Sequence, residues 1–302
     1  MDALSPDLRQ EYEQRIGALV QLELPPVVSL RCLATLIGYS SKFLGAIVKN
    51  QEHYYRTFII PKGNKRRTIH APKVALKVIQ KWFGHHLAEQ LEFHDSVYGF
   101  VRGRSSVNAA QVHCGARWIY SVDIKDFFPS TSLDKVYHSL VEIGIPGGGA
   151  DLVARLCCYR SNLAQGSPAS PILSNLVFRH ADEELSEIAV NNGLRHTRYA
   201  DDIVFSGTED LPETVKEEIK QVVISRGWQL SDKKEYFAQQ PNRLKVHGLL
   251  VHGERARLTK GYRNRIRAYK HLLAAGKITD EDIFRVKGHL NYAKSVEEIE
   301  GQ

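Results

Sequence analysis

Two adjacent carboxylates between two short β-prone runs constrain this chain more than any other feature. Asp201 and Asp202 follow the run 197–199 and precede the run 203–205, a pattern that predicts a hairpin with the acids at its turn. Neighbouring carboxylates repel, and at reduced dielectric one of them stays protonated unless a cation joins them. Oxygen ligands suit a hard ion such as Mg²⁺. The pair therefore predicts a metal site for phosphoryl transfer, with a solvated turn as the alternative.

A third acid follows an apolar run earlier in the chain. Residues 118–123 are typical of a buried strand, and Asp123 is the last of them. An unpaired acid is costly in such a place, and a metal ion would remove that cost. Asp126, Phe127 and Phe128 are expected on the turn beyond the strand, close to the metal, with burial in the core as the alternative for the two rings.

The composition indicates an ordinary globular protein with a polyanionic partner. The chain has 302 residues, 43% hydrophobic and 25% charged, and a formal net charge of +7. That charge favours nucleic acid first and an acidic membrane surface second. No window approaches 18 apolar residues, and the acidic N-terminus is no signal peptide, so a cytoplasmic protein without membrane contact is expected. The 4 cysteines lack Cys-x-x-Cys spacing, which argues against a zinc site or a disulfide framework.

Helices are predicted from apolar spacing, caps and breakers. Three of them form an N-terminal preface over residues 5–24, 29–37 and 41–48, and others are predicted for 73–91, 172–190 and 211–226. In the helix 73–91 the predicted buried side consists of Val74, Val78, Trp82 and Leu87.

Basic and glycine-bearing segments are candidates for phosphate contacts. Residues 54–69 predict a hairpin whose tip carries Lys62, Lys65, Arg66 and Arg67, either as a phosphate clamp or as a solvated loop. The loop 97–106 contains Arg102 and Arg104, and the loop 163–171 contains Gln165 and Gly166, where backbone can approach a flat partner closely.

The stretch 255–277 is basic throughout and contains no Asp or Glu. Tyr262, Ile266, Tyr269 and Leu273 fall on one helical face within it. A helix that is buried on one side and basic on the other suits a nucleic-acid backbone.

Four motifs in this order resemble those of reverse transcriptases. They are Lys-Gly-Asn-Lys-Arg-Arg at 62–67, Asp-Ile-Lys-Asp-Phe-Phe-Pro-Ser at 123–130, Gln-Gly-Ser-Pro-Ala-Ser-Pro at 165–171 and Tyr-Ala-Asp-Asp at 199–202. The resemblance runs from Tyr54 to the C-terminus. Within the family the chain is most similar to bacterial retron enzymes, because of Cys157-Cys158-Tyr159, the compact length and the missing maturase or endonuclease region.

Two landmarks of retron enzymes depart from the usual pattern. Ala109-Ala110 stand in the register of Asn-Ala-x-x-His, although Asn108 is adjacent, and Val246-His247-Gly248 replaces Val-Thr-Gly. Both departures concern RNA recognition and leave room for another defence-associated branch.

The resemblance implies an α+β fold of the right-hand polymerase type. The expected division is an N-terminal helical extension at 1–50, fingers at 51–118 with 155–190 inserted between palm segments, a palm with an antiparallel sheet at 119–154 and 191–249, and a helical thumb at 250–302.

The resemblance also implies roles for individual residues. Asp123, Asp201 and Asp202 would hold two Mg²⁺ ions, with Mn²⁺ as a possible substitute, Asp202 acting less directly than Asp201 and the Ile124 carbonyl adding a ligand. Lys62 and Arg67 would clamp the dNTP triphosphate, Gln165 would border the nascent base pair and Phe128 would exclude a ribose 2′-OH. Asp126 and Phe127 complete the expected dNTP site. The expected nucleic-acid contacts are Lys65, Arg66, Arg102, Arg104, His113, Gly166, Tyr199, Lys233, Lys234, His247, Arg257, Lys260, Arg263, Arg267 and Lys270.

A retron-like enzyme implies a particular reaction and set of partners. It would copy a structured, msr-msd-like non-coding RNA from a guanosine 2′-OH, giving branched RNA-linked msDNA, with a host ribonuclease H to remove template and a separate effector or toxin in anti-phage defence. The alternatives are another defence-associated or group II intron-like reverse transcriptase, a catalytically silent nucleic-acid scaffold, and a metal nuclease using the same acids.

Overall fold

The computed structural model describes residues 6–63 and 65–299, and the chain divides into two compact units. Unit 1 comprises residues 1–93 and 126–180, and unit 2 comprises residues 94–125 and 181–302. The chain passes from unit 1 to unit 2 for the second time within helix α8 (Ser170–Asn191). The finer division into fingers, palm and thumb stays a prediction.

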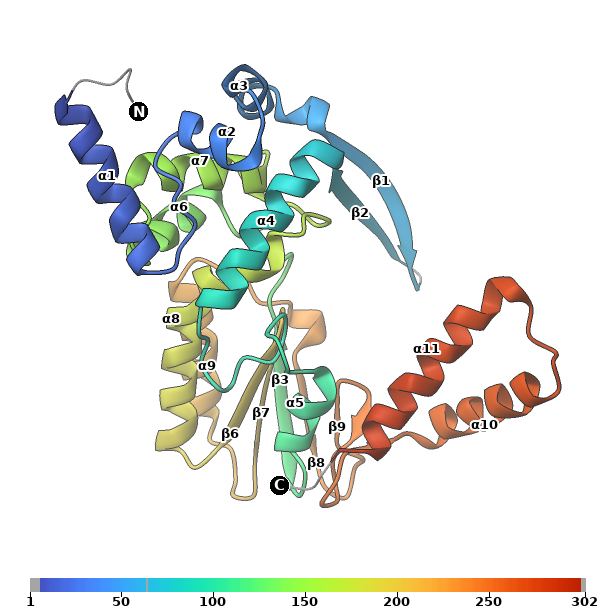
Figure 1. Cartoon of the computed structure of the whole chain (residues 1–302). Helices are drawn as coiled ribbons and strands as arrows, with labels where there is room; N and C mark the ends of the chain where they lie inside the picture. The colour runs from blue at the N-terminus through green and yellow to red at the C-terminus, as the bar shows by residue number, and fades with distance from the viewer. Residues whose placement is uncertain (1–5, 64, 300–302) are drawn as a thin grey trace. The chain divides into compact units, whose positions relative to one another are not determined.

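Unit 1 is mainly helical and contains one long hairpin (Figure 1). Its elements are α1 (Pro6–Gln21), α2 (Leu30–Ile37), α3 (Ser41–Lys49), a 3-10 turn η1 (Gln51–Tyr54), β1 (Tyr55–Lys62), β2 (Lys65–Pro72), α4 (Val74–Gln90), α6 (Leu133–Glu142), α7 (Gly147–Cys157), β4 (Cys158–Tyr159), β5 (Asn162–Leu163) and the first part of α8. Local chemistry sets several boundaries: the Ser29 hydroxyl accepts from the backbone N of Cys32 at 3.3 Å, and α2 ends at Gly38 with φ 74°.

The basic hairpin predicted from residues 54–69 is confirmed as β1 and β2. Their antiparallel register pairs Tyr55 with Pro72 at one end and Lys62 with Lys65 at the other. Asn64 and the side chains of Lys62 and Lys65 lie outside the described residues. Arg66 is exposed and Arg67 is half-buried.

The buried face of α4 differs from the sequence prediction. Val74 and Val78 are 79% and 47% exposed, so their assignment to the core is wrong. The side chains that pack inward are Leu76, Ile79, Gln80, Phe83 and Leu87. The spacing of apolar residues in α4 is compatible with burial of either face of the helix. The observed face is buried because it packs against core residues of α7 and α8.

Unit 2 is built on a four-stranded antiparallel sheet in the order β6-β7-β3-β8. Its elements are α5 (Ser106–Val112), β3 (Trp118–Asp123), the second part of α8, β6 (Arg195–Tyr199), β7 (Asp202–Gly207), α9 (Glu213–Ser225), a 3-10 turn η2 (Asp232–Lys234), β8 (Tyr236–Gln239), β9 (Lys245–Val246), β10 (Leu249–Leu250), β11 (Arg257–Leu258), α10 (Lys260–Ala274) and α11 (Asp280–Glu297). The last two helices form an antiparallel pair (Figure 1). This confirms a helix in the basic stretch 255–277.

Two histidines are buried in unit 2 on β6 and near it. His113 lies between β6 and β7: its Nδ1 is 2.7 Å from Ser206 Oγ and its Nε2 is 2.8 Å from Thr197 Oγ1. Burial lowers the pKa of His113 well below its ordinary value and lowers the pKa of His196 to about 3. The nucleic-acid contact predicted for His113 is therefore wrong, because both of its ring nitrogens are occupied inside the core.

In the described ranges, no helix combines the length and the apolar character needed to cross a lipid bilayer.

Acidification is expected to destabilise the protein through His113 and His196. Both pKa values are lower in the folded state than the value of about 6.5 of an unfolded chain, so the stability is complete above about pH 6.5 and falls as the pH drops toward the folded values. Each histidine should cost about 1 kcal/mol of unfolding free energy between about pH 7 and pH 5.5, measurable from urea midpoints at the two pH values.

The matched comparison uses His113→Gln and the exposed His252→Gln. His113→Gln should remove the contribution of one histidine from the pH dependence of the unfolding free energy. His252→Gln should leave that pH dependence unchanged. If the unfolding free energy varied equally with pH in both variants, the assignment of this pH dependence to buried imidazoles would be contradicted.

Candidate active site

The hairpin predicted around the two adjacent acids is confirmed as β6 and β7. Tyr199 pairs with Asp202 at its end, so the turn consists of Ala200 and Asp201. Ala200 has a φ of 58°, a left-handed conformation that glycine adopts at no steric cost and alanine does not. The turn is therefore held by its surroundings.

Backbone pairing brings the third acid to the same place. Asp123 is the last residue of β3 and lies opposite Asp202 of β7 in the antiparallel register. The backbone N of Ile124 donates to the carbonyl of Asp201 at 2.8 Å, and the backbone N of Ser231 donates to the carbonyl of Asp123 at 2.8 Å. The strand end, the hairpin turn and the segment before η2 are thus joined by main-chain hydrogen bonds.

A lysine and a histidine side chain face the three carboxylates. Lys234 Nζ lies 2.5 Å from Asp123 Oδ2 and 3.9 Å from Asp201 Oδ2, while His247 Nδ1 lies 3.3 Å from Asp202 Oδ2. Burial raises the pKa of Asp123, the Lys234 ammonium opposes this rise, and the neighbouring Asp201 adds to it. Burial and the neighbouring acids together therefore raise the pKa of Asp123 more than Lys234 lowers it.

The acids fit a divalent cation at Asp123 and Asp201. Among the described residues, Asp123 Oδ1 is buried without a hydrogen-bond partner, and Lys234 shows that the same two carboxylates can face one positive charge. Asp202 points to His247 instead. Within residues 6–63 and 65–299 no three Asp, Glu, His or Cys side chains are grouped closely enough to form a metal cage. A hard ion that keeps water ligands suits this sparse oxygen set.

His247 occupies the position at which the retron pattern has threonine. Its side chain is only 9% exposed, its ring centre is 5.3 Å from that of Tyr199, and its Nε2 is buried without a partner in the part of the chain that the structure describes. It lies against the acid rather than on the surface, so its predicted contact with nucleic acid is not visible in this conformation.

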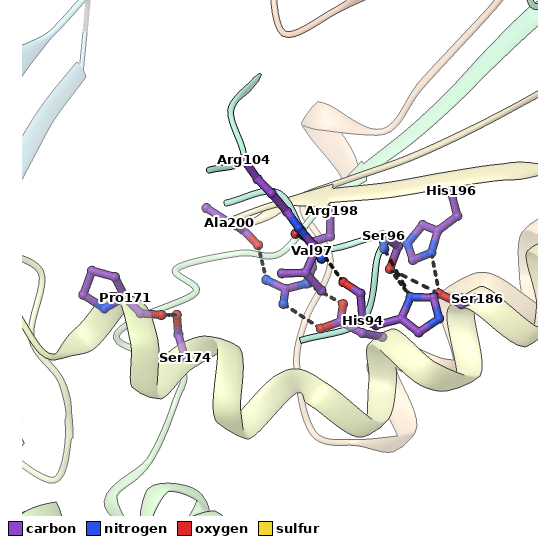
Figure 2. A network of polar contacts seen from close by, with 11 residues as sticks. His94, Ser96, Val97, Arg104, Pro171, Ser174, Ser186, His196, Arg198 and Ala200 are labelled. Carbon is purple, nitrogen blue, oxygen red and sulfur yellow. Dashed lines mark hydrogen bonds and ion pairs between the residues drawn. The ribbon is translucent and has the colours of Figure 1, made fainter. Parts of the chain in front are cut away.

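A polar layer lies beneath the hairpin in unit 2 (Figure 2). The Ser186 hydroxyl lies 3.1 Å from Nδ1 of both His94 and His196. Arg104 donates to the carbonyls of His94 and Val97 at 2.7 Å each and pairs with Asp95 at 2.9 Å. The guanidinium of Arg104 thus has three partners within the protein, while its side chain is still 26% exposed, and its predicted contact with nucleic acid stays a prediction.

The residues predicted for the dNTP site belong to unit 1. The Gln165 carbonyl accepts from the backbone N of His70 on β2 at 2.8 Å, and a Cβ on Gly166 would lie 2.9 Å from the His70 carbonyl oxygen. Gly166 therefore permits close packing of this loop on the basic hairpin, at a φ of 127°.

The two phenylalanines of the predicted gate have different environments. Phe127 is 5% exposed and packs edge-on against Phe178 at 5.8 Å, so its assignment to the dNTP site is corrected: it is a core residue. Phe128 is half-buried, and Asp126 before the pair is exposed with a φ of 49°.

Of the remaining predicted nucleic-acid contacts in unit 2, Tyr199 is half-buried and the basic residues are open to solvent. Lys233 and Arg102 are exposed, as are the basic side chains of β11 and α10, which are Arg257, Lys260, Arg263, Arg267 and Lys270. Ile266, Tyr262 and Tyr269 lie on the buried side of α10.

Sequence reasoning missed two supporting residues. Gln80 is fully buried in unit 1 and bonds the Tyr55 hydroxyl at 2.7 Å, the Leu156 carbonyl at 2.8 Å and the Ser167 hydroxyl at 2.8 Å. Arg198 is fully buried in unit 2 and pairs with Asp182. Gln80 could have been found from the sequence, because it is a polar residue on the apolar face of a helix. The sequence around Arg198 contains no comparable signal.

Replacing Lys234 by Gln is expected to destabilise the protein when EDTA is present. The substitution leaves Asp123 and Asp201 without their shared cation, at a cost of about 1 kcal/mol in the free energy of unfolding. Urea unfolding measures the change, with the exposed Lys233→Gln as the control. Saturating Mg²⁺ should narrow the difference. A Lys234→Gln protein as stable as the control in EDTA would show that the ammonium does not compensate the acids.

Comparison with known proteins gives the family. Residues 60–251 match the family model described as reverse transcriptase (RNA-dependent DNA polymerase). The retron Ec86 reverse transcriptase of Escherichia coli is 29% identical over 284 residues, which cover 92% of this chain and 88% of that protein. The retron Mx162 reverse transcriptase of Myxococcus xanthus is 29% identical over 89% of this chain, which spans 62% of that protein.

The fold comparison points the same way. A solved telomerase from Candida albicans, in complex with a fragment of telomeric RNA, aligns with a TM-score of 0.50 and 11% identity over 72% of this chain and 50% of that one. This likeness supports the right-hand polymerase fold expected from the motifs. The resemblance to retron-type enzymes is confirmed, and the chain belongs to the reverse transcriptase family, the RNA-dependent DNA polymerases.

Proposed function

We propose that this protein is the polymerase of a retron and that it copies part of a structured non-coding RNA into branched, RNA-linked msDNA. Synthesis starts from a guanosine 2′-OH of that RNA and consumes dNTPs. The observation that carries the polymerase proposal is the meeting of Asp123, Asp201 and Asp202 at one end of the β3–β7 pair. The retron part is supported by the similarity to the Escherichia coli and Myxococcus xanthus enzymes.

The acids are proposed to hold two divalent ions, Mg²⁺ or in its place Mn²⁺. Asp123 and Asp201 are the principal ligands, because they already share one cationic partner. Asp202 contributes less directly than Asp201, and the Ile124 carbonyl adds a ligand. Bound ions supply activation of the primer hydroxyl and neutralisation of the triphosphate. The protein's own part is to hold the carboxylates by main-chain pairing and to keep Asp123 partly buried, where its charge acts at reduced dielectric.

Substrate contacts are proposed for residues of both units. Lys62 and Arg67 of the β1–β2 hairpin bind the triphosphate, Gln165 borders the nascent base pair and Phe128 excludes a ribose 2′-OH. The basic side of α10 follows the phosphates and 2′-hydroxyls of the RNA, whose recognition rests on shape more than on base edges. Host ribonuclease H and a separate effector protein, in anti-phage defence, are the proposed further partners.

Replacing Asp201 and Asp202 together by Asn is expected to abolish DNA synthesis. The change preserves side-chain volume and removes the charge that would hold the ions, so incorporation of labelled dNTPs on the co-purified RNA should fall by roughly a thousandfold or more. Asp210→Asn, an exposed acid beyond β7, is the matched control.

The outcomes separate the competing functions. Unchanged synthesis in the double variant would remove the acids from the active site. A wild type that retains RNA and incorporates nothing would favour a silent scaffold, and cleavage of the RNA instead of extension would favour a nuclease.

Neutralising Arg263 and Arg267 on α10 is expected to shallow the salt dependence of RNA binding. Each lost phosphate contact should reduce the slope of log K against log salt concentration by about 0.7 to 0.9. Arg9→Gln with Arg15→Gln removes the same charge from α1, where both arginines pair with neighbouring glutamates, and serves as the control. An unaltered slope after the α10 substitutions would place the RNA elsewhere.

A further inference from the structure

Arg198 is a fully buried cation on β6, in the position directly before Tyr199. Its Nε and Nη2 bind the two carboxylate oxygens of Asp182 on α8 at 2.6 Å each. Its Nη1 donates to the Ala200 carbonyl at 3.0 Å, as Figure 2 shows. One guanidinium therefore links a helix to the turn that carries Asp201.

Stability alone is a weak reason for this arrangement. Burial raises the pKa of Asp182 even though Arg198 opposes the rise, so the ionised form of Asp182 is disfavoured at this place. Buried ion pairs can often be replaced by apolar residues without loss of stability. The third bond, to the Ala200 carbonyl, is the one that distinguishes Arg198 from a packing residue.

The backbone around Arg198 is fixed as well. Its N donates to the Ser96 carbonyl at 2.7 Å, and its carbonyl accepts from the backbone N of Tyr98 at 2.8 Å. A Cβ on Gly99 would overlap the backbone N of Ala200, so this segment packs directly on the turn. The strained conformation of Ala200 is thus enclosed by main chain on one side and by the Arg198 guanidinium on the other.

We propose that Arg198, oriented by Asp182, is a positioning residue that sets the Ala200–Asp201 turn and with it the direction of the Asp201 carboxylate toward Asp123. Its kinetic consequence rests on the proposed polymerase function. The effect of Arg198 on cation binding by Asp123 and Asp201 is independent of that function, because this effect concerns only the geometry of the two acids.

Three variants of the full chain separate positioning from folding. Arg198→Met combined with Asp182→Leu replaces the ion pair by apolar side chains, which such sites often tolerate, and removes the donor to Ala200. Arg198→Lys keeps the charge but lacks the fork needed to reach Asp182 and Ala200 together. Arg195→Lys is the matched control, because Arg195 lies on the same strand and donates to the carbonyls of Val112 and Cys114 at 2.9 and 2.6 Å.

The measurements are the melting temperature, Mn²⁺ affinity by electron paramagnetic resonance, and kcat and KM for dNTP. Both Arg198 variants should fold, bind Mn²⁺ roughly 10 to 100-fold more weakly and lose kcat by a similar factor, with KM for dNTP nearly unchanged. Arg195→Lys should match the wild type in Mn²⁺ affinity and kcat.

Either Arg198 variant can overturn the inference. If the double variant has the Mn²⁺ affinity and kcat of Arg195→Lys, then Arg198 serves packing alone. Where the double variant does not fold, the same result for Arg198→Lys leads to the same conclusion. If the wild type makes no DNA but binds Mn²⁺, and the Arg198 variants bind it more weakly, then positioning is supported while the polymerase proposal fails.

Discussion

The acidic site depends on the antiparallel register of β3 with β7. In a strand successive side chains point to opposite faces, so a slip of one residue would exchange the core face with the other face along the whole pair. Both faces of β3 are packed, because Trp118, Tyr120 and Val122 on one face and Ile119 on the other are each 1% exposed, and this packing opposes a slip. In the register that results, Asp123 lies opposite Asp202. The position of the acids is therefore a consequence of the core.

Local patterns predicted those parts of the structure that local interactions determine. The acidic hairpin, the strand that ends at Asp123, the basic hairpin and the basic helix α10 were all predicted from spacing, turn residues and charge. The burial of His113 was not predicted and that of Phe127 was only an alternative, because each is enclosed by segments distant in the chain. The same limit applies to Lys234 and Asp123, whose side chains meet although the residues are 111 positions apart.

In both units buried polar side chains support a loop of the candidate site. In unit 1 Gln80 uses its amide to join β1, α7 and the loop that follows Gly166. In unit 2 the hairpin lies over His113, which joins β6 to β7, and over the network of Ser186 with His94 and His196. Buried hydrogen bonds of this kind favour one arrangement of the residues that they join, although Nε2 of His196 has no hydrogen-bond partner among the described residues. Apolar packing alone would leave the polar backbone of these loops with fewer fixed partners.

The pairing of Asp123 and Asp201 with Lys234, and of Asp202 with His247, has a consequence for how the protein is made. An acidic centre without internal cations would need bound metal before its strands could come together at neutral pH. Here Lys234 brings one positive charge to the place where Asp123 and Asp201 converge. The Lys234 ammonium therefore lowers the electrostatic cost of bringing these two carboxylates together when no divalent ion is bound.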